Sequence, residues 1–483
     1  MKTRIFFNLF ITILIVILAF GIIFVHKQID QRRKSEKLNL VLISIDTLRA
    51  DHMGVYGYKK DTTPNIDAWA KNAFVFTNAV TVIPETFPSM ISIFTSLNPV
   101  KSKLTSNMVG PMKRSTGTLT QILKKNKFVN AAFLNSVALT KELTNLDTNF
   151  DTYVDYDVIQ DDPNDFDHKE NYENFISEGL EWLGKHKKSK FFFWMHLIDP
   201  HAPYSPPDDL KCKFNTNFCK TIFTSSSEDL EEKRLSLWRC HSSPLAKKDN
   251  ELFKTLYDGS VAYTDKLVKR IFTKLESTGL DKKTIVVLLS DHGEGFDHNY
   301  YFDHGDNLYD SNNKIALLIK HPFYKEKQKK INQLVQSIDI APTLLQLLHI
   351  SDGIPFSDGI SFSNIFKSGF ITNILFSKKR DFAYSMTRTG GAKSIYDGRY
   401  KFISTKKGAN CQYNNQEREL YDISKDPNEL HNIYNQEKKR SLSLQERLNN
   451  YFKDDIKPPA GNFDKVDKKI LQERLERLKS LGY

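Results

Sequence analysis

The chain has 483 residues, of which 40% are hydrophobic and 12% aromatic, and this composition excludes a disordered or collagen-like protein. Its 69 basic and 58 acidic residues give a formal net charge of +11, spread along the chain except for a short basic run at 31–37. Nucleic-acid binding is therefore not expected. The length predicts a large core and more than one domain.

The first apolar segment, residues 6–25, is long enough to cross a bilayer as one helix; it contains no charged residue, and Asn8 is its one amide side chain. No small-residue cleavage pattern follows it, which favours an uncleaved anchor over a removed signal peptide. Basic residues lie on both sides of the segment, so charge alone does not fix its orientation. We expect residues 1–37 to be a single-pass membrane anchor and a linker.

Alternating strand and helix patterns follow the linker. Apolar runs without polar alternation predict buried strands at 38–45, 128–134, 190–197, 284–290 and 315–320. Helical patterns lie between these runs, at 65–72, 88–97, 119–125, 174–185 and 258–275. This order predicts an α/β fold with a mostly parallel sheet covered by helices on both faces.

A polar stretch at 205–250 interrupts this order and contains three of the four cysteines. We interpret it as a surface insertion in a domain that spans 38–372, and residues 155–167 as an acidic loop. The cysteines allow a Cys212–Cys219 disulfide, a link to Cys240, or free thiols; Cys411 is the fourth. Short strands with turns and a charged helical tail at 465–481 indicate a smaller C-terminal subdomain, 373–483.

Two carboxylates and a histidine come directly after predicted strands. Asp46 follows the strand at 38–45, and Asp291 and His292 follow the strand at 284–290. The carboxyl ends of parallel strands meet at one edge of a sheet, where α/β proteins bind ligands. Oxygen and nitrogen ligands together suit a divalent metal ion. The competing interpretation, an ordinary polar turn, is about equally good for a lone Asp-His pair.

Thr86 precedes Pro88 and a predicted helix, and Pro88 suits the first helical turn. Free backbone N–H groups at a helix N-terminus favour an oxyanion. A hydroxyl beside a metal ion can act as a nucleophile, so Thr86 is a candidate catalytic residue and metal ligand. The alternative is that Thr86 only caps the helix.

Two further histidines lie in loops at predicted strand ends. His201 stands between Pro200 and Pro203, which stiffen its loop, and His304 lies in a second Asp-His-Gly sequence. Either imidazole could bind anionic ester oxygens or protonate a leaving group. A surface or structural role is the alternative for each histidine alone.

The chain resembles the sulfatase family of the alkaline-phosphatase-like superfamily over residues 38–483. The matching motifs are IDTLRADHMGVYGY, TPNIDAWAKNAFVFTNA, HLIDPHAPY, LLSDHGEGFDHN with FDHGDNLYD, IDIAPTLLQLL, DGRYKFI, ELYDISKDPNELHNI and the terminal LKSLGY. The resemblance implies a three-layer α/β sandwich with a small α+β subdomain around a four-stranded sheet. It also implies a domain outside the cytoplasm, either periplasmic or extracellular.

The resemblance further implies one divalent cation, most often calcium, with zinc or manganese in related lipid-headgroup transferases. Its metal positions match Asp46, Asp291 and His292, with Thr86 at the nucleophile position. His201 and His304 match substrate-contacting positions. The second adjacent aspartate of many sulfatases is Thr47 here.

Other departures bear on the chemistry. Sulfatases carry Cys-x-Pro-Ser-Arg, or Ser in the first place, and that first residue becomes formylglycine. This chain has Thr86 and Met90 at the two ends of the motif, so no formylglycine is expected. The Lys and His pair after the next strand is also absent, where the chain has Asn135 and Ser136.

We therefore expect a membrane-anchored, metal-dependent hydrolase of sulfate or phosphate esters with a Thr nucleophile. Its substrate would be an anionic sulfated or phosphorylated glycan, lipid headgroup or small molecule. Threonine at this position also resembles the phosphoethanolamine and phosphoglycerol transferases, which is one alternative. A catalytically inactive sulfatase-like binding protein is another.

Overall fold

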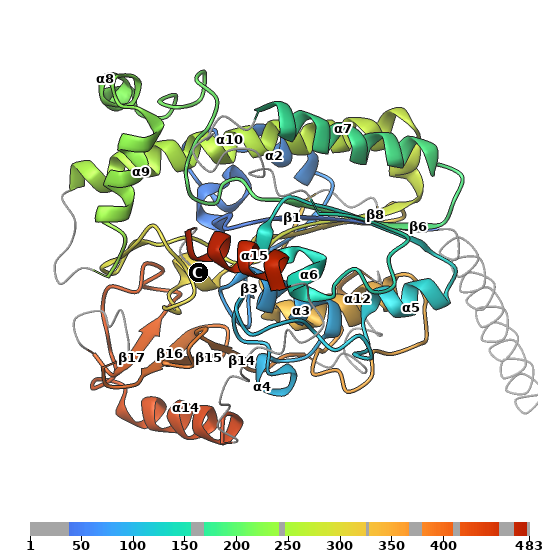
Figure 1. Ribbon diagram of the computed structural model, residues 1–483. Helices are drawn as coiled ribbons and strands as arrows, with labels where there is room; N and C mark the ends of the chain where they lie inside the picture. Colours follow the sequence, from blue (N-terminus) through green and yellow to red (C-terminus); the bar gives the residue numbers. More distant parts are fainter. Residues whose placement is uncertain are drawn as a thin grey trace, which may run out of the picture.

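The computed structural model describes residues 38–155, 169–240, 247–324, 328–366, 379–408, 416–453 and 468–480. It shows a large mixed sheet between two layers of helices and a smaller sheet beside it (Figure 1). The predicted anchor, nearly all of the acidic loop and the predicted boundary at 372 lie outside the described residues. In the part of the chain that is described, no helix combines the length and apolar character needed to cross a bilayer.

The large sheet has eight strands in the order β12-β2-β11-β8-β1-β6-β4-β5. In that order they are Lys329–Ile331, Phe74–Phe76, Leu317–Lys320, Thr284–Ser290, Asn39–Ile45, Phe191–Leu197, Val129–Leu134 and Thr152–Asp155. β1 lies at the centre and pairs in parallel with both β8 and β6. The mixed α/β fold with a large, mostly parallel sheet is thus confirmed.

β11 departs from the parallel expectation, because it runs antiparallel to both β8 and β2. The chain leaves β8 at Ser290 and re-enters the sheet near Ala316, and these two residues are joined by a backbone hydrogen bond of 3.0 Å. The segment between them stays at one edge of the sheet, since no helix carries the chain back to the other edge. The next strand therefore runs in the opposite direction.

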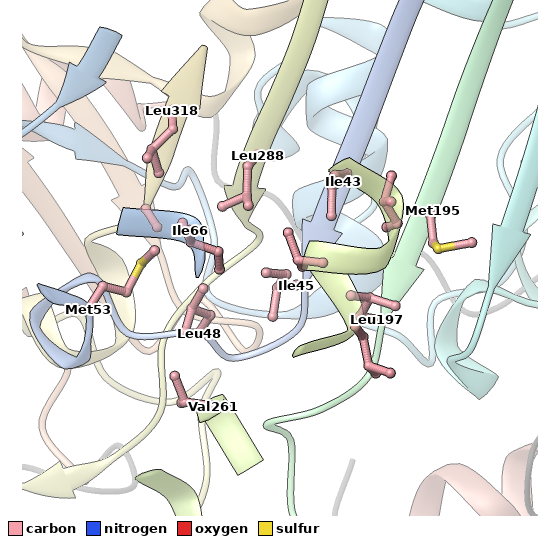
Figure 2. Packing of buried hydrophobic residues seen from close by; sticks show 14 of the residues in the cluster. Ile43, Ile45, Leu48, Met53, Ile66, Met195, Leu197, Val261, Leu288 and Leu318 are labelled. Atoms are coloured by element: carbon pink, nitrogen blue, oxygen red, sulfur yellow. The ribbon is translucent and has the colours of Figure 1, made fainter. Parts of the chain in front are cut away.

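Helices cover both faces of the sheet (Figure 1). One face packs against α2 (Pro64–Ala70), α7 (Lys169–Lys185) and α10 (Lys247–Ser277), and the other against α3 (Thr86–Thr95), α5 (Leu119–Lys125) and α12 (Ile340–Leu347). Alternate residues of β1 point to opposite cores, so Ile43 and Ile45 belong to the first core and Leu42 to the second. Figure 2 shows Ile43 and Ile45 packed with Met195 and Leu288 of the neighbouring strands. Burial on both faces explains the unbroken apolar run.

The predicted insertion contains α8 (Cys219–Thr224), α9 (Ser227–Ser236) and β7 (Arg239–Cys240). A disulfide joins Cys212 and Cys219, which confirms one of the pairings that the sequence allows. A capping box between Ser226 and Asp229 begins α9. α10 then begins at Lys247, well before the predicted start at residue 258.

The smaller sheet is antiparallel and has the order β14-β15-β16-β17, with bounds Ala383–Met386, Ala392–Tyr396, Tyr400–Thr405 and Arg418–Asp422. α14 (Lys438–Tyr451) lies against this sheet (Figure 1). Its Leu444 and Leu448 belong to the core that it shares with the sheet. The last described helix, α15 (Lys468–Ser480), instead packs its Leu478 against Val137 and Leu143, beside the large sheet.

Short elements complete the fold. The strands are β3 (Ala79–Val80), β9 (Phe296–Asp297), β10 (Tyr300–Tyr301) and β13 (Val335–Gln336), and the short α-helices are α4 (Pro99–Ser102), α6 (Lys141–Thr144) and α11 (Asp310–Asn313). The 3-10 helices are η1 (Ala50–His52), η2 (Gly54–Tyr56), η3 (Val137–Leu139), η4 (Thr216–Phe218), η5 (Leu280–Lys283), η6 (Ser337–Asp339) and η7 (Ser363–Phe366).

Candidate active site

Asp46 and Asp291 lie side by side at the carboxyl edge of the large sheet. Each follows its strand by one residue, and the last residues of the two strands, Ile45 and Ser290, are paired in register. Both side chains are 0% exposed. The backbone N–H groups of Thr47 and His292 donate to Asp291 Oδ1 at 3.3 and 2.9 Å. The convergence that the sequence predicts for these carboxylates is present.

His196 is a third member of this group, and it was missed by the sequence reasoning. It lies on β6, and its Nε2 is 3.3 Å from Asp46 Oδ2 while its Nδ1 is 2.8 Å from Ser44 Oγ. Ligand atoms of Asp46, His196 and Asp291 lie within 4.8 Å of one another, which is close enough to hold one metal ion. A histidine in an otherwise apolar strand, FFFWMHL, is the sequence signal that could have identified it.

Thr86 faces these residues from the start of α3. Its Oγ1 lies 3.4 Å from Asp46 Oδ2 and 3.4 Å from His292 Nε2. Thr86 is the first helical residue, whereas the N-cap position belongs to Glu85. The alternative role of Thr86 as a helix cap therefore does not describe this helix, and its hydroxyl is directed into the carboxylate group.

The N-terminal turn of α3 is fixed by hydrogen bonds on several sides. Ser89 Oγ donates to the carbonyl oxygen of Asp291 at 2.8 Å, which ties the helix to the end of β8. The N–H of Phe87 donates to Asn107 Oδ1 at 2.8 Å, and the N–H of Ser89 donates to the carbonyl of Glu85. The expectation of free N–H groups here is thus wrong for Phe87 and Ser89, because the side chain of Asn107 and the helix itself already accept from them.

His201 and His304 also lie at this site. The ring centroids of His292 and His304 are 4.2 Å apart, and those of His201 and His304 are 5.1 Å apart. His201 Nδ1 contacts the carbonyl oxygen of Ala202. The structure therefore brings together every site residue that the sequence singled out.

The pKa shifts reflect two carboxylates buried close to each other. Burial raises the pKa of Asp291 to about 6, and the negative charge of Asp46 adds to the rise. Burial acts on Asp46 in the same sense, but the hydrogen bond with His196 and the nearby imidazoles lower its pKa below the ordinary value. For His292, burial lowers the pKa, and the two carboxylates outweigh it and raise the pKa. The site holds negative charge that its own side chains compensate only in part.

The positions at which the chain departs from the sulfatase motifs are buried in the structure. Met90 is fully buried in the apolar core on the α3 side of the sheet, so no cation is placed there. Asn135 and Ser136 follow β4 and are also buried. The guanidinium groups whose charge acts on His304 belong instead to Arg234, on α9, and Arg388, after β14.

Comparison with known proteins gives the same picture. The family model described as Sulfatase matches residues 38–350, and the model for the C-terminal part of N-sulphoglucosamine sulphohydrolase matches residues 297–455. An arylsulfatase of Clostridium perfringens is 26% identical over 463 residues, covering 83% of this chain and 91% of its own. A Delta 4,5-hexuronate-2-O-sulfatase of Bacteroides thetaiotaomicron is 21% identical, covering 82% of this chain and 85% of its own.

Solved structures share the fold. A protein solved in complex with its substrate D-glucosamine-2-N,6-O-disulfate matches with a TM-score of 0.66 at 17% identity, covering 86% of this chain and 98% of its own. A phosphonate monoester hydrolase of Agrobacterium radiobacter matches with a TM-score of 0.63 at 17% identity, covering 85% and 94%. The Sulfatase model alone spans well over half of the 483 residues. The chain belongs to the sulfatase family of hydrolases.

Proposed function

We propose that this protein is a metal-dependent hydrolase of sulfate esters that uses Thr86 as its nucleophile. The observation that carries the proposal is the placement of the Thr86 hydroxyl, 3.4 Å from both Asp46 and His292 at the start of a helix. A nucleophilic hydroxyl needs a neighbouring group or ion that lowers its pKa.

The residues around Thr86 fit a divalent cation. Asp46 Oδ1 and Asp291 Oδ2 are buried and have no hydrogen-bond partner among the described residues. Buried carboxylate oxygens of this kind are costly unless a proton or a cation compensates them. Asp46 and Asp291 would hold the ion, with His196 and His292 as nitrogen ligands. The resemblance favours calcium, whereas two imidazole nitrogens beside two carboxylates suit zinc better than calcium, which prefers oxygen ligands. When bound, the cation would supply positive charge at the Thr86 hydroxyl and at the ester oxygens.

The protein's own residues then position the reaction. The hydrogen bond from Ser89 to the Asp291 carbonyl holds α3, and therefore the Thr86 Oγ1 atom, against the end of β8. His201 and His304 lie beyond His292 and are placed to donate hydrogen bonds to the ester. Attack by Thr86 Oγ1 would form a Thr ester and release the alcohol, and water would then hydrolyse the Thr ester. Threonine has no second hydroxyl to expel the group, so this second step requires direct attack by water.

The relatives favour a sulfated glycan as substrate. One is described as acting on hexuronate 2-O-sulfates, and another was solved with a disulfated glucosamine. A second candidate is transfer or hydrolysis of a phosphate ester. A phosphoryl group on the single hydroxyl of threonine can be removed by displacement at phosphorus, which is easier than removal of a sulfuryl group. The phosphonate monoester hydrolase among the solved structures has the same fold. A protein that binds such esters without turnover is a third candidate.

We also propose that the protein is anchored in a membrane by residues 6–25, with the catalytic part outside the cytoplasm, either in the periplasm or outside the cell. The Cys212–Cys219 disulfide supports this placement, since disulfides persist mainly in oxidising compartments. Protease accessibility of the catalytic part in intact cells would test it.

The decisive experiment is trapping of the Thr ester. Purified protein would be quenched during turnover of sulfur-35-labelled sulfate esters and phosphorus-32-labelled phosphate esters, and the peptide containing Thr86 would be isolated. We expect label from the sulfate ester on Thr86, no label in Thr86→Ala, and retained label in Thr86→Ser. Label from the phosphate ester alone would favour the second candidate. Full turnover by Thr86→Ala would refute the nucleophile.

A further inference from the structure

Two buried hydrogen-bond donors around the candidate site have no acceptor among the described residues: Asn107 Nδ2, next to the start of α3, and Arg388 Nη1, next to the segment that follows His304. We propose that these two groups donate hydrogen bonds to anionic oxygens of the substrate, so that Asn107 and the C-terminal subdomain supply donors where the nucleophile motif has Met90 in place of an arginine. The inference rests on the proposed function and assigns the residues that recognise the anion.

Arg388 is held in a fixed orientation by the segment that follows His304. Its Nε and Nη2 donate to the two oxygens of Asp306 at 3.2 and 2.6 Å, and its backbone N–H donates to the carbonyl of Gly305 at 3.0 Å. A Cβ atom at Gly305, where φ is +95°, would lie 3.2 Å from Arg388 Cδ, so the side chain lies flat against this glycine. The residue is 9% exposed. Nε and Nη2 are thus occupied, and Nη1 has no hydrogen-bond partner among the described residues, while the carboxylates of Asp303 and Glu85 also act on the charge of this guanidinium.

Arg388 is connected to the candidate site through Gly305 and His304. The Arg388 N–H donates to the carbonyl oxygen of Gly305, which places this residue beside His304. The ring centroid of His304 lies 4.2 Å from that of His292, whose Nε2 is 3.4 Å from Thr86 Oγ1. The carboxylate of Glu85, which directly precedes Thr86, is among the charges that act on Arg388.

Asn107 spans the nucleophile. Its backbone N–H donates to Glu85 Oε1 at 3.1 Å, and its Oδ1 accepts from the N–H of Phe87 at 2.8 Å, so it contacts the residues on both sides of Thr86. Because Oδ1 accepts a hydrogen bond, the other terminal atom is the amide nitrogen. This amide group is buried, and leaving it without an acceptor is unfavourable.

A contrast with Arg234 shows why Arg388 is the anion-binding residue. Arg234 is 3% exposed and also acts on His304, but Glu231 accepts from its Nε and Nη2, and the carbonyl of Phe302 accepts from its Nη1. Its guanidinium is fully used within the protein, whereas Arg388 keeps one donor. An anionic oxygen, from sulfate or carboxylate, is the acceptor that a guanidinium binds most strongly.

The test measures anion binding without turnover. Isothermal titration calorimetry with inorganic sulfate would compare the wild-type protein with Arg388→Gln, Arg388→Lys and Asn107→Asp. We expect sulfate affinity to fall at least about tenfold in each variant, because a charge-assisted hydrogen bond is lost. Arg388→Lys keeps the positive charge and the contact with Asp306, so the variant should still fold. A loss of sulfate affinity in this variant therefore reports the loss of the Nη1 donor. Asn107→Asp keeps the acceptor for Phe87 but removes the donor and adds a negative charge, so Asn107→Ala, which removes the donor without adding a charge, is measured beside it.

Arg380→Gln is the matched control, because the Arg380 side chain is similarly buried but Asp339 accepts from its Nε and Nη2 and the carbonyl of Phe382 accepts from its Nη1. It should lower the melting temperature and leave sulfate affinity unchanged. Sulfate affinity within twofold of the wild type in Arg388→Lys and Asn107→Asp, or no sulfate binding by the wild type, would overturn the inference. Either result leaves labelling of Thr86 unaffected, so failure of the inference is distinguishable from failure of the proposed function.

Turnover then identifies which anionic group binds. 4-Nitrophenyl sulfate carries only the reacting group, whereas D-glucosamine-2-N,6-O-disulfate carries a second one. An increase in KM for both substrates places Arg388 on the reacting sulfate. An increase for the disulfate alone places it on the neighbouring group. An unchanged KM for both contradicts the inference.

Discussion

Two buried aspartates in this molecule have opposite surroundings. Asp258, on α10, is 0% exposed, and its oxygens contact His52 Nδ1 at 2.7 Å and accept from Tyr58 and Lys60 at 2.8 Å. Burial would raise its pKa, but these hydrogen bonds outweigh burial and lower it. Asp291 is equally buried, yet Oδ2 has no hydrogen-bond partner among the described residues and the pKa rises to about 6.

The difference separates a structural carboxylate from one that serves a ligand. Partners within the protein make the ionised form of Asp258 part of the stable fold. Asp291 instead faces a second carboxylate, Asp46, and this repulsion must be offset by a proton or a cation. A buried carboxylate that the fold leaves uncompensated is evidence for a site, whereas a buried carboxylate with full hydrogen bonding is evidence for stability.

The sharpest test replaces the uncompensated carboxylate. Asp291→Asn should lower kcat/KM by at least about a thousandfold, because a ligand of the cation and a charge at the reacting centre are lost together. The metal-free variant should be no less stable than the metal-free wild type, and more stable by about 1 kcal/mol, since the repulsion with Asp46 is removed. Urea unfolding in a chelator and steady-state kinetics measure the two effects. Marked destabilisation of the metal-free variant would show that Asp291 is structural.

The same substitution at Asp258 should have the opposite consequences. Asp258→Asn should destabilise the protein by about 2 kcal/mol, because hydrogen bonds to an ionised group are lost. The activity per folded molecule should change less than about twofold. Unfolding in urea gives the free energy of unfolding. Titration of the active sites with labelled substrate gives the fraction of active protein, and kcat is calculated per active molecule. A large loss of kcat at full folding would place Asp258 in the reaction.

Much of this organisation could be predicted from the sequence. The parts that the sequence did not predict share one cause. β1, β4, β6 and β8 were found because a strand buried on both faces is a continuous apolar run, which is a local signal. β2, β5 and β12 were missed because they have three or four residues each and depend on their neighbours for pairing. The direction of β11 depends on the path of the preceding loop.

The site divides in the same way. Asp46 and Asp291 were identified because each directly follows a strand, and the sheet brings strand ends together. Glu85, Asn107 and Arg388 have no such signal, because their placement depends on contacts between segments far apart in sequence. Resemblance located the nucleophile position, but the contacts of Asn107 with Glu85 and Phe87 and the place of Arg388 beside Gly305 required the structure.

Removal of the metal should affect the two aspartates differently. A ligand that binds only the folded state adds about 2.7 kcal/mol of stability at a hundredfold excess over its Kd. Addition of EDTA should therefore lower the melting temperature of the wild type and of Asp258→Asn by similar amounts. It should leave the melting temperature of Asp291→Asn almost unchanged. Differential scanning fluorimetry, with elemental analysis of the bound metal, measures both; equal shifts in all three proteins would contradict a metal site at Asp291.

The smallest effect concerns pH. The pKa of Asp258 is lowered in the folded protein, so its contribution to stability is complete above the unfolded value of about 3.9 and is lost as the pH falls through the folded value. The gap in unfolding free energy between the wild type and Asp258→Asn should thus stay constant from neutral pH down to about pH 5 and shrink below about pH 4. Urea unfolding of both proteins across this range measures the gap. A gap that widens on acidification would mean that the folded protein favours the protonated form of Asp258. The contrast between the two aspartates would then have to be abandoned.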